Sequence, residues 1–533
     1  MRLVLVALWI TLAFPATAAD TDRTAVDAGH VSFRTSCEAI QPAFDRAVAL
    51  LHSFEYPESE KAFRAILEDA PECAIARWGI AMSLWHPLWA PPNRKSLASG
   101  SAILRDTASA APTARENAYL AAISAFYEAH ETRDHGARAR AYSDRMAEVY
   151  EAHLDDPEAA VFYALSLLAT ASPKDKSYAH QFKAAGLLNW VRNDHPHHPG
   201  VLHYLIHSYD FPGLAHLALP AARLYADVAP DSAHAQHMPS HIFTRLGLWE
   251  RSIASNHDST ASAAHYTEYA NLPGHYDEGL HSMDYLLYAL LQTARDEQAR
   301  NHLQRMARLG KPNEQNFKVA YTYAAGPARY ALERRDWEEA SRVALTPSEF
   351  PWAEFPWAQS IVHFARGIGA ARSSRLDDAR GELARLREIR DSLAPTTLPY
   401  WREEVFVHVA AVESWIELRA GNVDRALMLA RAAADREDAV DKHPVTPGEV
   451  VPARELLGDM LLEVDQPHEA LTEYRAVLES SPNRWNAMLG AARSSARTGD
   501  QVAARGYYRR LVEQSAPQAD ERGALREARA ALD

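Results

Sequence analysis

Apolar residues recur at spacings of three and four along most of the chain, which is the period of an amphipathic helix. The clearest segments are DRAVALLHSF at 45–54, AYLAAISAFYEAH at 118–130, AVFYALSLLATA at 160–171, MDYLLYALLQTA at 283–294 and HVAAVESWIELRAG at 408–421. The strict alternation typical of a β-strand is nearly absent. The pattern predicts an all-α protein.

The helical pattern repeats at both ends of the chain with a period of about 34 residues, which is typical of the tetratricopeptide repeat (TPR). Small and aromatic residues recur where two antiparallel helices must approach closely. In the C-terminal copy, which begins at Val451, these residues and the proline that ends the unit are Gly458, Ala470, Tyr474 and Pro482, and the first three have counterparts one period later at Ala492, Ala504 and Tyr508. Near the N-terminus the same spacing joins Ala47, Ser59, Phe63 and Pro71. We therefore expect a TPR-like helix-turn-helix repeat solenoid.

Proline-rich segments interrupt the pattern at His195–Gly200, Asn271–His275, Thr346–Trp357 and His443–Pro452. The third of them is the best candidate for a division of the chain. We therefore expect an N-terminal TPR-like array over residues 20–345 and a C-terminal TPR array over residues 358–533. The alternative is a long internal loop in a single array.

Residues 1–19 have the pattern of a secretory signal peptide. Arg2 precedes an apolar run, and small residues follow at Ala18 and Ala19. We therefore expect a periplasmic or secreted protein. In an oxidising compartment the only two cysteines, Cys37 and Cys73, can form a disulfide, and two buried free thiols are the alternative.

The overall charge narrows the choice of partners. The chain has 56 Lys and Arg against 70 Asp and Glu, a formal net charge of −14, and no basic cluster interrupts this balance. Such a surface argues against nucleic acid as a partner. After the signal peptide, no apolar run reaches the roughly 18 residues that a membrane-spanning helix needs, so we expect no membrane span.

Histidine is concentrated in one part of the chain, where 13 of the 25 histidines lie between positions 195 and 281. HYLIH places His203 and His207 four residues apart, and HMPSH does the same for His237 and His241. The second pair follows the first by one repeat length. Residues four apart share one helix face, and equivalent positions of adjacent repeats stack side by side. The spacing predicts four imidazoles on one patch of the concave face.

The next helix, HSMDYLLYALL, extends this patch. It would add His281, Asp284 and Tyr288 to the same face.

A second histidine pair has the same period and begins the groove. His52 in LLHSFEY and His86 in SLWHPLW are one repeat length apart, and Trp78 and Trp85 stand near them in the sequence. We expect these four residues, with Tyr288, to line a groove that holds a ligand. Packing of the aromatic residues in the core is the alternative.

Imidazole is a common ligand of copper, zinc and iron, and histidines at i and i+4 grip such an ion from one helix. The two pairs would supply enough nitrogen ligands for one ion, with Asp284 or Asp210 as an oxygen ligand or as a hydrogen-bond partner of a ligating histidine. A transition metal ion is therefore the candidate cofactor. Histidines that hydrogen-bond a peptide in the groove, or that have no ligand at all, are the alternatives.

Several catalytic signatures are absent from the sequence. HETRDH at His130–His135 lacks the HExxH spacing of zinc proteases, and the chain has no GxSxG, no GxxxxGK[ST] and no CxxCH. The catalytic residues, if there are any, stay unassigned.

Several stretches together resemble a group of exported bacterial TPR proteins. They are SFRTSCEAI, ALLHSFEYPESEKAFRAIL, RWGIAMSLWHPLWAPP, HHPGVLHYLIHSYDFPGLAHLAL, HAQHMPSHIFTRLGLWERSIASN and PARELLGDMLLEV. The resemblance implies an architecture but no reaction. We expect an exported binding protein that holds a peptide, protein or small ligand in a His-lined concave groove, with a transition metal as the candidate cofactor. The alternatives are a redox or hydrolytic metalloenzyme and a scaffold of the cell envelope.

Overall fold

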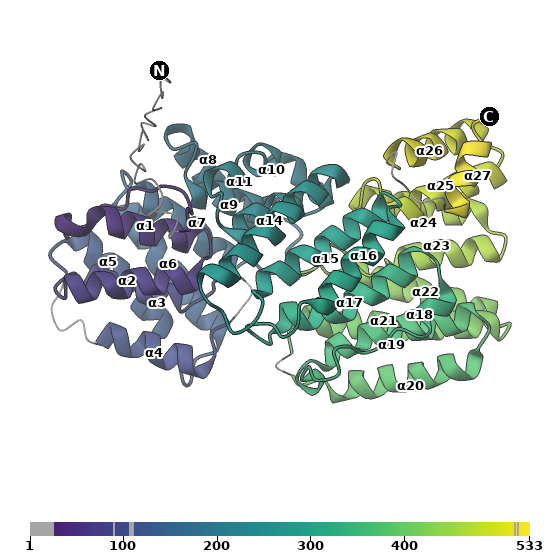
Figure 1. Ribbon diagram of the computed structural model, residues 1–533, viewed down its shortest axis with the longest axis horizontal. Helices are drawn as coiled ribbons and strands as arrows, with labels where there is room; N and C mark the ends of the chain where they lie inside the picture. Colours follow the sequence, from purple (N-terminus) through teal and green to yellow (C-terminus); the bar gives the residue numbers. More distant parts are fainter. Residues whose placement is uncertain (1–25, 89–90, 106–110, 396, 516–518, 520–521) are drawn as a thin grey trace, which may run out of the picture.

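The computed structural model describes residues 26–88, 91–105, 111–395, 397–515, 519 and 522–533. The chain is all-α, as the apolar spacing predicts, and these residues contain no β-strand (Figure 1). No helix among them is both long enough and apolar enough to cross a membrane. The predicted signal peptide lies outside the described residues.

Most successive helices contact one another, and α1 to α7 lie at one end of the molecule (Figure 1). The first half of the chain forms η1 (Glu38–Ile40), α1 (Gln41–His52), α2 (Tyr56–Asp69), α3 (Ile75–Ser83), α4 (Arg94–Arg105), α5 (Ala114–Tyr127), α6 (His135–Ala152), α7 (Pro157–Ala169), α8 (Ala179–Asp194), α9 (Pro199–Tyr209), α10 (Ala215–Ala222), α11 (Tyr225–Val228), α12 (Ala233–His237), α13 (Pro239–Arg245) and α14 (Trp249–Tyr269).

Helices α15, α16 and α17 lie between this end and the C-terminal end, where α18 to α27 gather (Figure 1). The second half forms α15 (Asp277–Gln292), α16 (Asp296–Arg308), α17 (Phe317–Glu333), α18 (Trp337–Ala340), η2 (Trp352–Glu354), α19 (Pro356–Arg372), α20 (Leu376–Ser392), α21 (Pro399–Arg419), α22 (Val423–Asp438), α23 (Ala453–Glu463), α24 (Pro467–Ser480), α25 (Trp485–Arg497), α26 (Gln501–Gln514) and α27 (Gly523–Ala530).

The small and aromatic residues of the repeat pack against one another as their spacing predicts. Tyr474 of α24 is buried, and its ring fills the space beside Gly458 of α23 and Gly490 of α25. A Cβ atom built on Gly458 would lie 2.9 Å from that ring. In the N-terminal copy Phe63 of α2 takes the same place and contacts Gly79 of α3. Small residues are therefore needed wherever an aromatic ring is inserted between helices.

Two large clusters of buried apolar side chains make up most of the core. One extends from Phe33 to Phe243, and the other extends from Leu280 to Ala491. The segment that we expected to divide the chain, Thr346–Trp357, lies inside the second cluster. There the ring of Trp357 stacks on Trp401 with their centroids 3.9 Å apart. The segment includes η2 and the first two residues of α19, and its Phe350, Trp352 and Trp357 side chains belong to this cluster.

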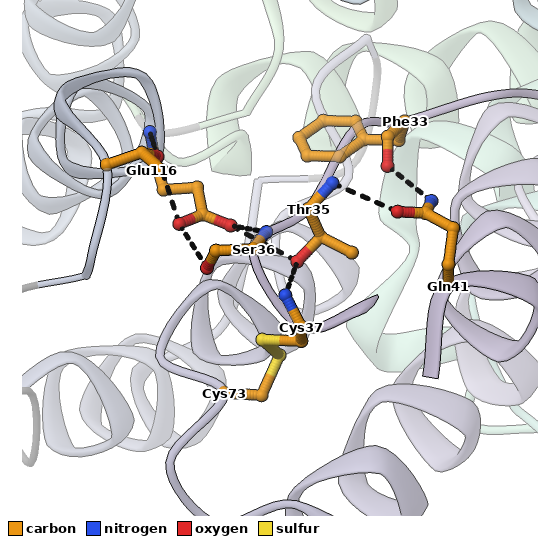
Figure 2. Close-up of a disulfide and its surroundings, with 8 residues drawn as sticks. Phe33, Thr35, Ser36, Cys37, Gln41, Cys73 and Glu116 are labelled. Atoms are coloured by element: carbon orange, nitrogen blue, oxygen red, sulfur yellow. Dashed lines mark hydrogen bonds between the residues drawn. A yellow bond between two sulfur atoms is a disulfide. The ribbon is translucent and has the colours of Figure 1, made fainter. Parts of the chain in front are cut away.

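Cys37 and Cys73 form a disulfide, with their Cα atoms 5.8 Å apart (Figure 2). The bond joins the segment before α1 to the turn between α2 and α3. Glu116 at the start of α5 holds the same segment, because its carboxylate accepts hydrogen bonds from the backbone N–H and the hydroxyl of Ser36 at 2.8 and 2.7 Å (Figure 2). The first helical unit is thus fixed both covalently and by hydrogen bonds.

Candidate metal centre

Six buried histidines come together from four helices in the middle of the chain. α9 carries His203 and His207, α12 carries His234 and His237, α13 carries His241, and α15 carries His281. They form two groups of three, and within each group the candidate ligand atoms lie within 4.8 Å of one another. We call His203, His207 and His234 the first triad, and His237, His241 and His281 the second triad.

Local sequence signals place these side chains. The side chain of Ser232 caps α12 by accepting a hydrogen bond from the N–H of Ala235. Pro239 has no N–H to donate, so α12 ends at His237 and α13 begins at Pro239. The residue between them, Met238, keeps helical backbone angles. His237 and His241 therefore stay on adjacent turns and face the same side.

The first triad has the nitrogen spacing of a metal site. Nε2 of His203 lies 3.0 Å from Nε2 of His207 and 3.1 Å from Nε2 of His234. Two nitrogen ligands at about 2.0–2.1 Å from an ion lie about 2.9 Å apart at a right angle and about 3.3 Å apart at a tetrahedral angle. Both measured distances fall between these values.

The hydrogen bonds of the second triad decide which nitrogen atoms carry protons. His237 donates from Nδ1 to Oδ1 of Asn256 at 2.7 Å, and the amide nitrogen of Asn256 is in turn occupied by the carbonyl of Ser252. His241 donates from Nδ1 to the carboxylate of Asp210 at 2.9 Å. A neutral imidazole has only one N–H, so both Nε2 atoms bear a lone pair.

These two lone pairs face each other, because Nε2 of His237 lies 3.0 Å from Nε2 of His241. A proton held between them would require an imidazolium. Burial, and after it the charges of His281 and His241, hold the pKa of His237 well below its ordinary value. The pKa of His241 is also lowered, mainly by burial. A metal cation held by both nitrogens removes the repulsion without protonating either ring.

His203 is fixed in the same way. It donates from Nδ1 to the backbone carbonyl of His52 at 2.7 Å, which leaves its Nε2 as the acceptor in the centre of the first triad. Burial, followed by the charges of His207 and His234, holds the pKa of His203 well below its ordinary value. In the second triad Nδ1 of His281 is buried and has no hydrogen-bond partner among the described residues. Both triads thus present unprotonated nitrogen atoms.

A small cavity borders both triads. It is lined by His234 of the first triad, by His241 and His281 of the second, and by Glu278, Phe317, Lys318, Pro444 and Val445. Its volume is about 10 Å³, which is close to the space that one water molecule occupies. Lys318 forms ion pairs with Asp277 and Glu278. A ligand of about the size of one water molecule fits beside the histidines.

The wall formed by Pro444 and Val445 comes from the connection between α22 and α23, far away in the sequence. Tyr285 of α15 holds this connection, because its hydroxyl lies 2.9 Å from the carbonyl oxygens of both Pro444 and Thr446. Lys442 Nζ donates to the same Thr446 carbonyl at 2.9 Å and lies 3.6 Å from Asp210. We call residues 442–446 the covering segment, since its Pro444 and Val445 form one wall of the cavity.

A third cluster, formed by His52, Glu158 and His198, has different chemistry. The Glu158 carboxylate is 2.9 Å from Nε2 of His52 and 3.0 Å from Nε2 of His198. Nδ1 of His198 accepts from the N–H of Val201, so Nε2 carries the proton and donates to Glu158. Nδ1 of His52 is 3.0 Å from the hydroxyl of Tyr204. Hydrogen bonds inside the protein satisfy these nitrogen atoms, and the cluster positions the His52 carbonyl that orients His203.

The predicted groove residues lie elsewhere. Trp78, Trp85 and His52 are fully buried in the N-terminal core, where Trp85 stacks on Phe126 at 4.0 Å between ring centroids. His86 stacks on Tyr56 at 4.1 Å. The expectation that His52, Trp78 and Trp85 line a ligand groove is therefore wrong, and the alternative holds, because these rings pack in the core.

Tyr288 and Asp284 also lie apart from the triads, although they share α15 with His281. Tyr288 is buried, and its hydroxyl accepts a hydrogen bond from Arg484 at 3.1 Å. The Asp284 carboxylate lies 3.7 Å from Nε of Arg329. Burial raises the pKa of this carboxyl to about 6, although Arg329 acts against the shift. Asp284 belongs to neither triad.

The sequence pattern predicted five of the six triad histidines, which are His203, His207, His237, His241 and His281. It did not predict His234. The repeat period pairs His237 with His203 and leaves His234 without a counterpart. The available signal is the i, i+3 spacing in HAQH, which puts His234 and His237 on neighbouring turns. The four paired histidines do not form one site, since each pair joins a different third histidine.

Comparisons with known proteins support the repeat assignment. A family model described as tetratricopeptide repeat matches residues 38–86 and 455–520. No curated protein matches the chain.

Several solved structures align with most of this chain at low sequence identity. The human IFIT1 dimer with m7Gppp-AAAA aligns at a TM-score of 0.37 and 11% identity, covering 87% of this chain and 95% of that one. The APC/C hetero-tetramer Cut9-Hcn1 aligns at a TM-score of 0.31 and 10% identity, covering 92% of this chain and 90% of that one. Yeast Tom70 aligns at 0.29 and 13% identity, covering 92% and 88%. At these TM-scores the likeness carries no argument about function, and the sequence matches show tetratricopeptide-type repeats near both ends of the chain.

Proposed function

We propose that this chain is an exported TPR-type protein that binds transition metal ions in its two histidine triads. The observation that carries the proposal is the pair of facing lone pairs on His237 and His241, whose Nε2 atoms lie 3.0 Å apart while both Nδ1 atoms donate elsewhere. A buried arrangement of this kind is repulsive without a cation and favourable with one.

The ligand set limits the choice of metal. Each triad offers imidazole nitrogen and no sulfur, which suits copper, zinc and iron better than calcium or magnesium. Copper binds most tightly among the divalent first-row ions at such a site. Three histidines also leave one coordination position free, as in catalytic zinc sites. We therefore favour copper as the bound ion, with zinc as its nearest competitor.

Two features support export. The apolar N-terminal run followed by small residues is typical of a signal peptide, and the disulfide between Cys37 and Cys73 suits an oxidising compartment. A buried metal site in an exported protein would acquire its ion in the periplasm or outside the cell.

The repeats support a second role in binding a partner protein, because TPR arrays present extended surfaces on which other chains dock. The six triad histidines are not part of such a surface, since each has less than a tenth of its surface exposed. A peptide bound directly by these histidines is therefore not part of the proposal.

Elemental analysis of the untagged protein, purified from an envelope or secreted fraction, tests metal binding. The expected result is bound copper or zinc that is reduced in His203→Gln and in His237→Gln, and lost in the double variant. Gln retains most of the side-chain volume and cannot supply the imidazole nitrogen.

The matched control is His265→Gln, since His265 is exposed on α14 and belongs to neither triad. It should keep the full metal content. Circular dichroism melts of all variants separate loss of metal from loss of fold. Wild-type protein that binds copper and zinc no better than a well-folded double variant would remove the proposal.

A further inference from the structure

The two triads are neighbours on the same helix. His234 belongs to the first triad and His237 to the second, and both lie on α12 at i and i+3. Side chains at this spacing stand on adjacent turns, with Cβ atoms about 5–6 Å apart. Across the triads, the rings of His207 and His241 have their centroids 6.3 Å apart. Ions held by the two triads would therefore lie close together.

One cavity serves both triads. His234 borders it from the first triad, and His241 and His281 border it from the second. We expect the free coordination position of each three-histidine ion to face this shared space, since histidines of both triads line it. Because its volume is about 10 Å³, the space admits one ligand of about the size of a water molecule.

The charge balance favours an anion as that ligand. All six ligands are neutral imidazoles when they bind metal, so two divalent ions bring four positive charges. The nearby carboxylates are already paired: Asp210 with Arg245, and Glu278 with Lys318. Burial raises the cost of uncompensated charge, so a small anion between the ions is stabilised strongly.

We propose that the two triads form one dinuclear centre whose ions share a bridging hydroxide in this cavity. This inference rests on the proposed metal binding and adds to it that the two ions act as a pair. The bridge would form when one water molecule that contacts both ions releases a proton to the bulk solvent, and its single oxygen atom is the size that the cavity admits.

Copper loading with electron paramagnetic resonance (EPR) tests the pairing. Copper(II) ions joined by a one-atom bridge couple their unpaired electrons, so most of their EPR signal disappears. Wild-type protein loaded with copper(II) should hold two copper ions per chain and show far less than one spin per copper. His203→Gln and His237→Gln should each hold one copper ion with a full spin. His265→Gln should behave like wild type.

Each other result overturns a distinct part of the argument. Two copper ions with two full spins would mean separate sites and would overturn the bridge while leaving metal binding intact. One copper ion in wild type, lost in either single variant, would mean one shared ion and would overturn the dinuclear centre. No bound copper or zinc in wild type would overturn the proposed function itself. The wild-type spin count decides the bridge even if a variant fails to fold.

Discussion

The carboxylate of Asp210 accepts a hydrogen bond from Nδ1 of His241 at 2.9 Å. Burial opposes the charge on Asp210, but Lys442 and Arg245 outweigh it and hold the pKa of this carboxyl well below its ordinary value. Asp210 is therefore ionised and can only accept. It turns the Nε2 lone pair of His241 toward His237, so this carboxylate orients a candidate metal ligand without contacting the metal position.

Asp210→Asn should weaken metal binding at the second triad. The amide carries no charge, so it neither fixes the His241 tautomer as firmly nor raises the basicity of its Nε2. Loss of such a partner typically lowers metal affinity about 10- to 100-fold. Competition with a chromophoric chelator measures the change. The control is Asp156→Asn, which removes a buried carboxylate bonded to Arg115 and Tyr119 in the N-terminal core. Equal affinities in both variants would argue against the orienting role.

Tyr285→Phe should speed up metal exchange. The hydroxyl holds the covering segment through the carbonyls of Pro444 and Thr446, and a hydrogen bond of this kind contributes about 0.5–1.5 kcal/mol. Without it, we expect metal transfer to excess chelator to become severalfold faster. Tyr127→Phe is the matched control, since it removes a buried hydroxyl that donates to the Ala81 carbonyl at 2.7 Å. An unchanged transfer rate in the Tyr285 variant would show that ions leave by another path.

Gly490→Ala should destabilise the C-terminal repeats, because its new methyl group would overlap with the ring of Tyr474. Overpacking of this kind costs about 1–3 kcal/mol. Gly506→Ala in α26 is the comparison, since a Cβ there has no atom within 4 Å. It should stabilise the helix by about 0.5–1 kcal/mol. Urea unfolding followed by circular dichroism should show a lower free energy of unfolding for Gly490→Ala and a higher one for Gly506→Ala. Equal changes in the two variants would contradict the packing argument.

Removal of the disulfide should lower stability without changing the metal content. The bond spans a sequence separation of 36 residues, and a cross-link over such a loop typically contributes about 2–4 kcal/mol. We expect the Cys37→Ser, Cys73→Ser double variant to unfold at lower urea and to become insensitive to reductant. Wild type should shift toward the variant when reduced. If reductant lowered the stability of the double variant as much as that of wild type, the loss of stability could not be due to the disulfide.

Stability at alkaline pH should depend on Glu404. Burial, followed by the charges of Glu449 and Glu403, raises the pKa of Glu404 to about 8, from 4.5 in an ordinary glutamate. The folded protein therefore binds this proton more tightly than the unfolded chain does. The resulting stability is fully present below pH 4.5 and is lost as the pH rises through about 8. Glu404→Gln should flatten the fall in the urea midpoint between pH 5 and pH 9, and an unchanged slope would contradict this assignment.

The local pattern of apolar residues was sufficient to predict the helices and the packing of side chains within a repeat. Tyr474 and Gly458 follow from the repeat period, because an aromatic and a small residue recur at these positions in the copies near both ends of the chain. The histidine pairs at 203 and 207 and at 237 and 241 follow from the same period. His52 and Trp85 show its limit: the period places a residue on one face of a helix, but it cannot tell whether another helix covers that face.

The sequence by itself determined the all-α repeat architecture and five of the six triad histidines, because both depend on spacings of a few residues or of one repeat. Only the tertiary structure decided how those histidines divide into two triads, that His234 joins the first, and that residues 442–446 cover the cavity. These features depend on contacts between segments that are far apart in the sequence, such as Asp210 with Lys442. The packing of the whole chain sets such contacts, and no local spacing encodes them.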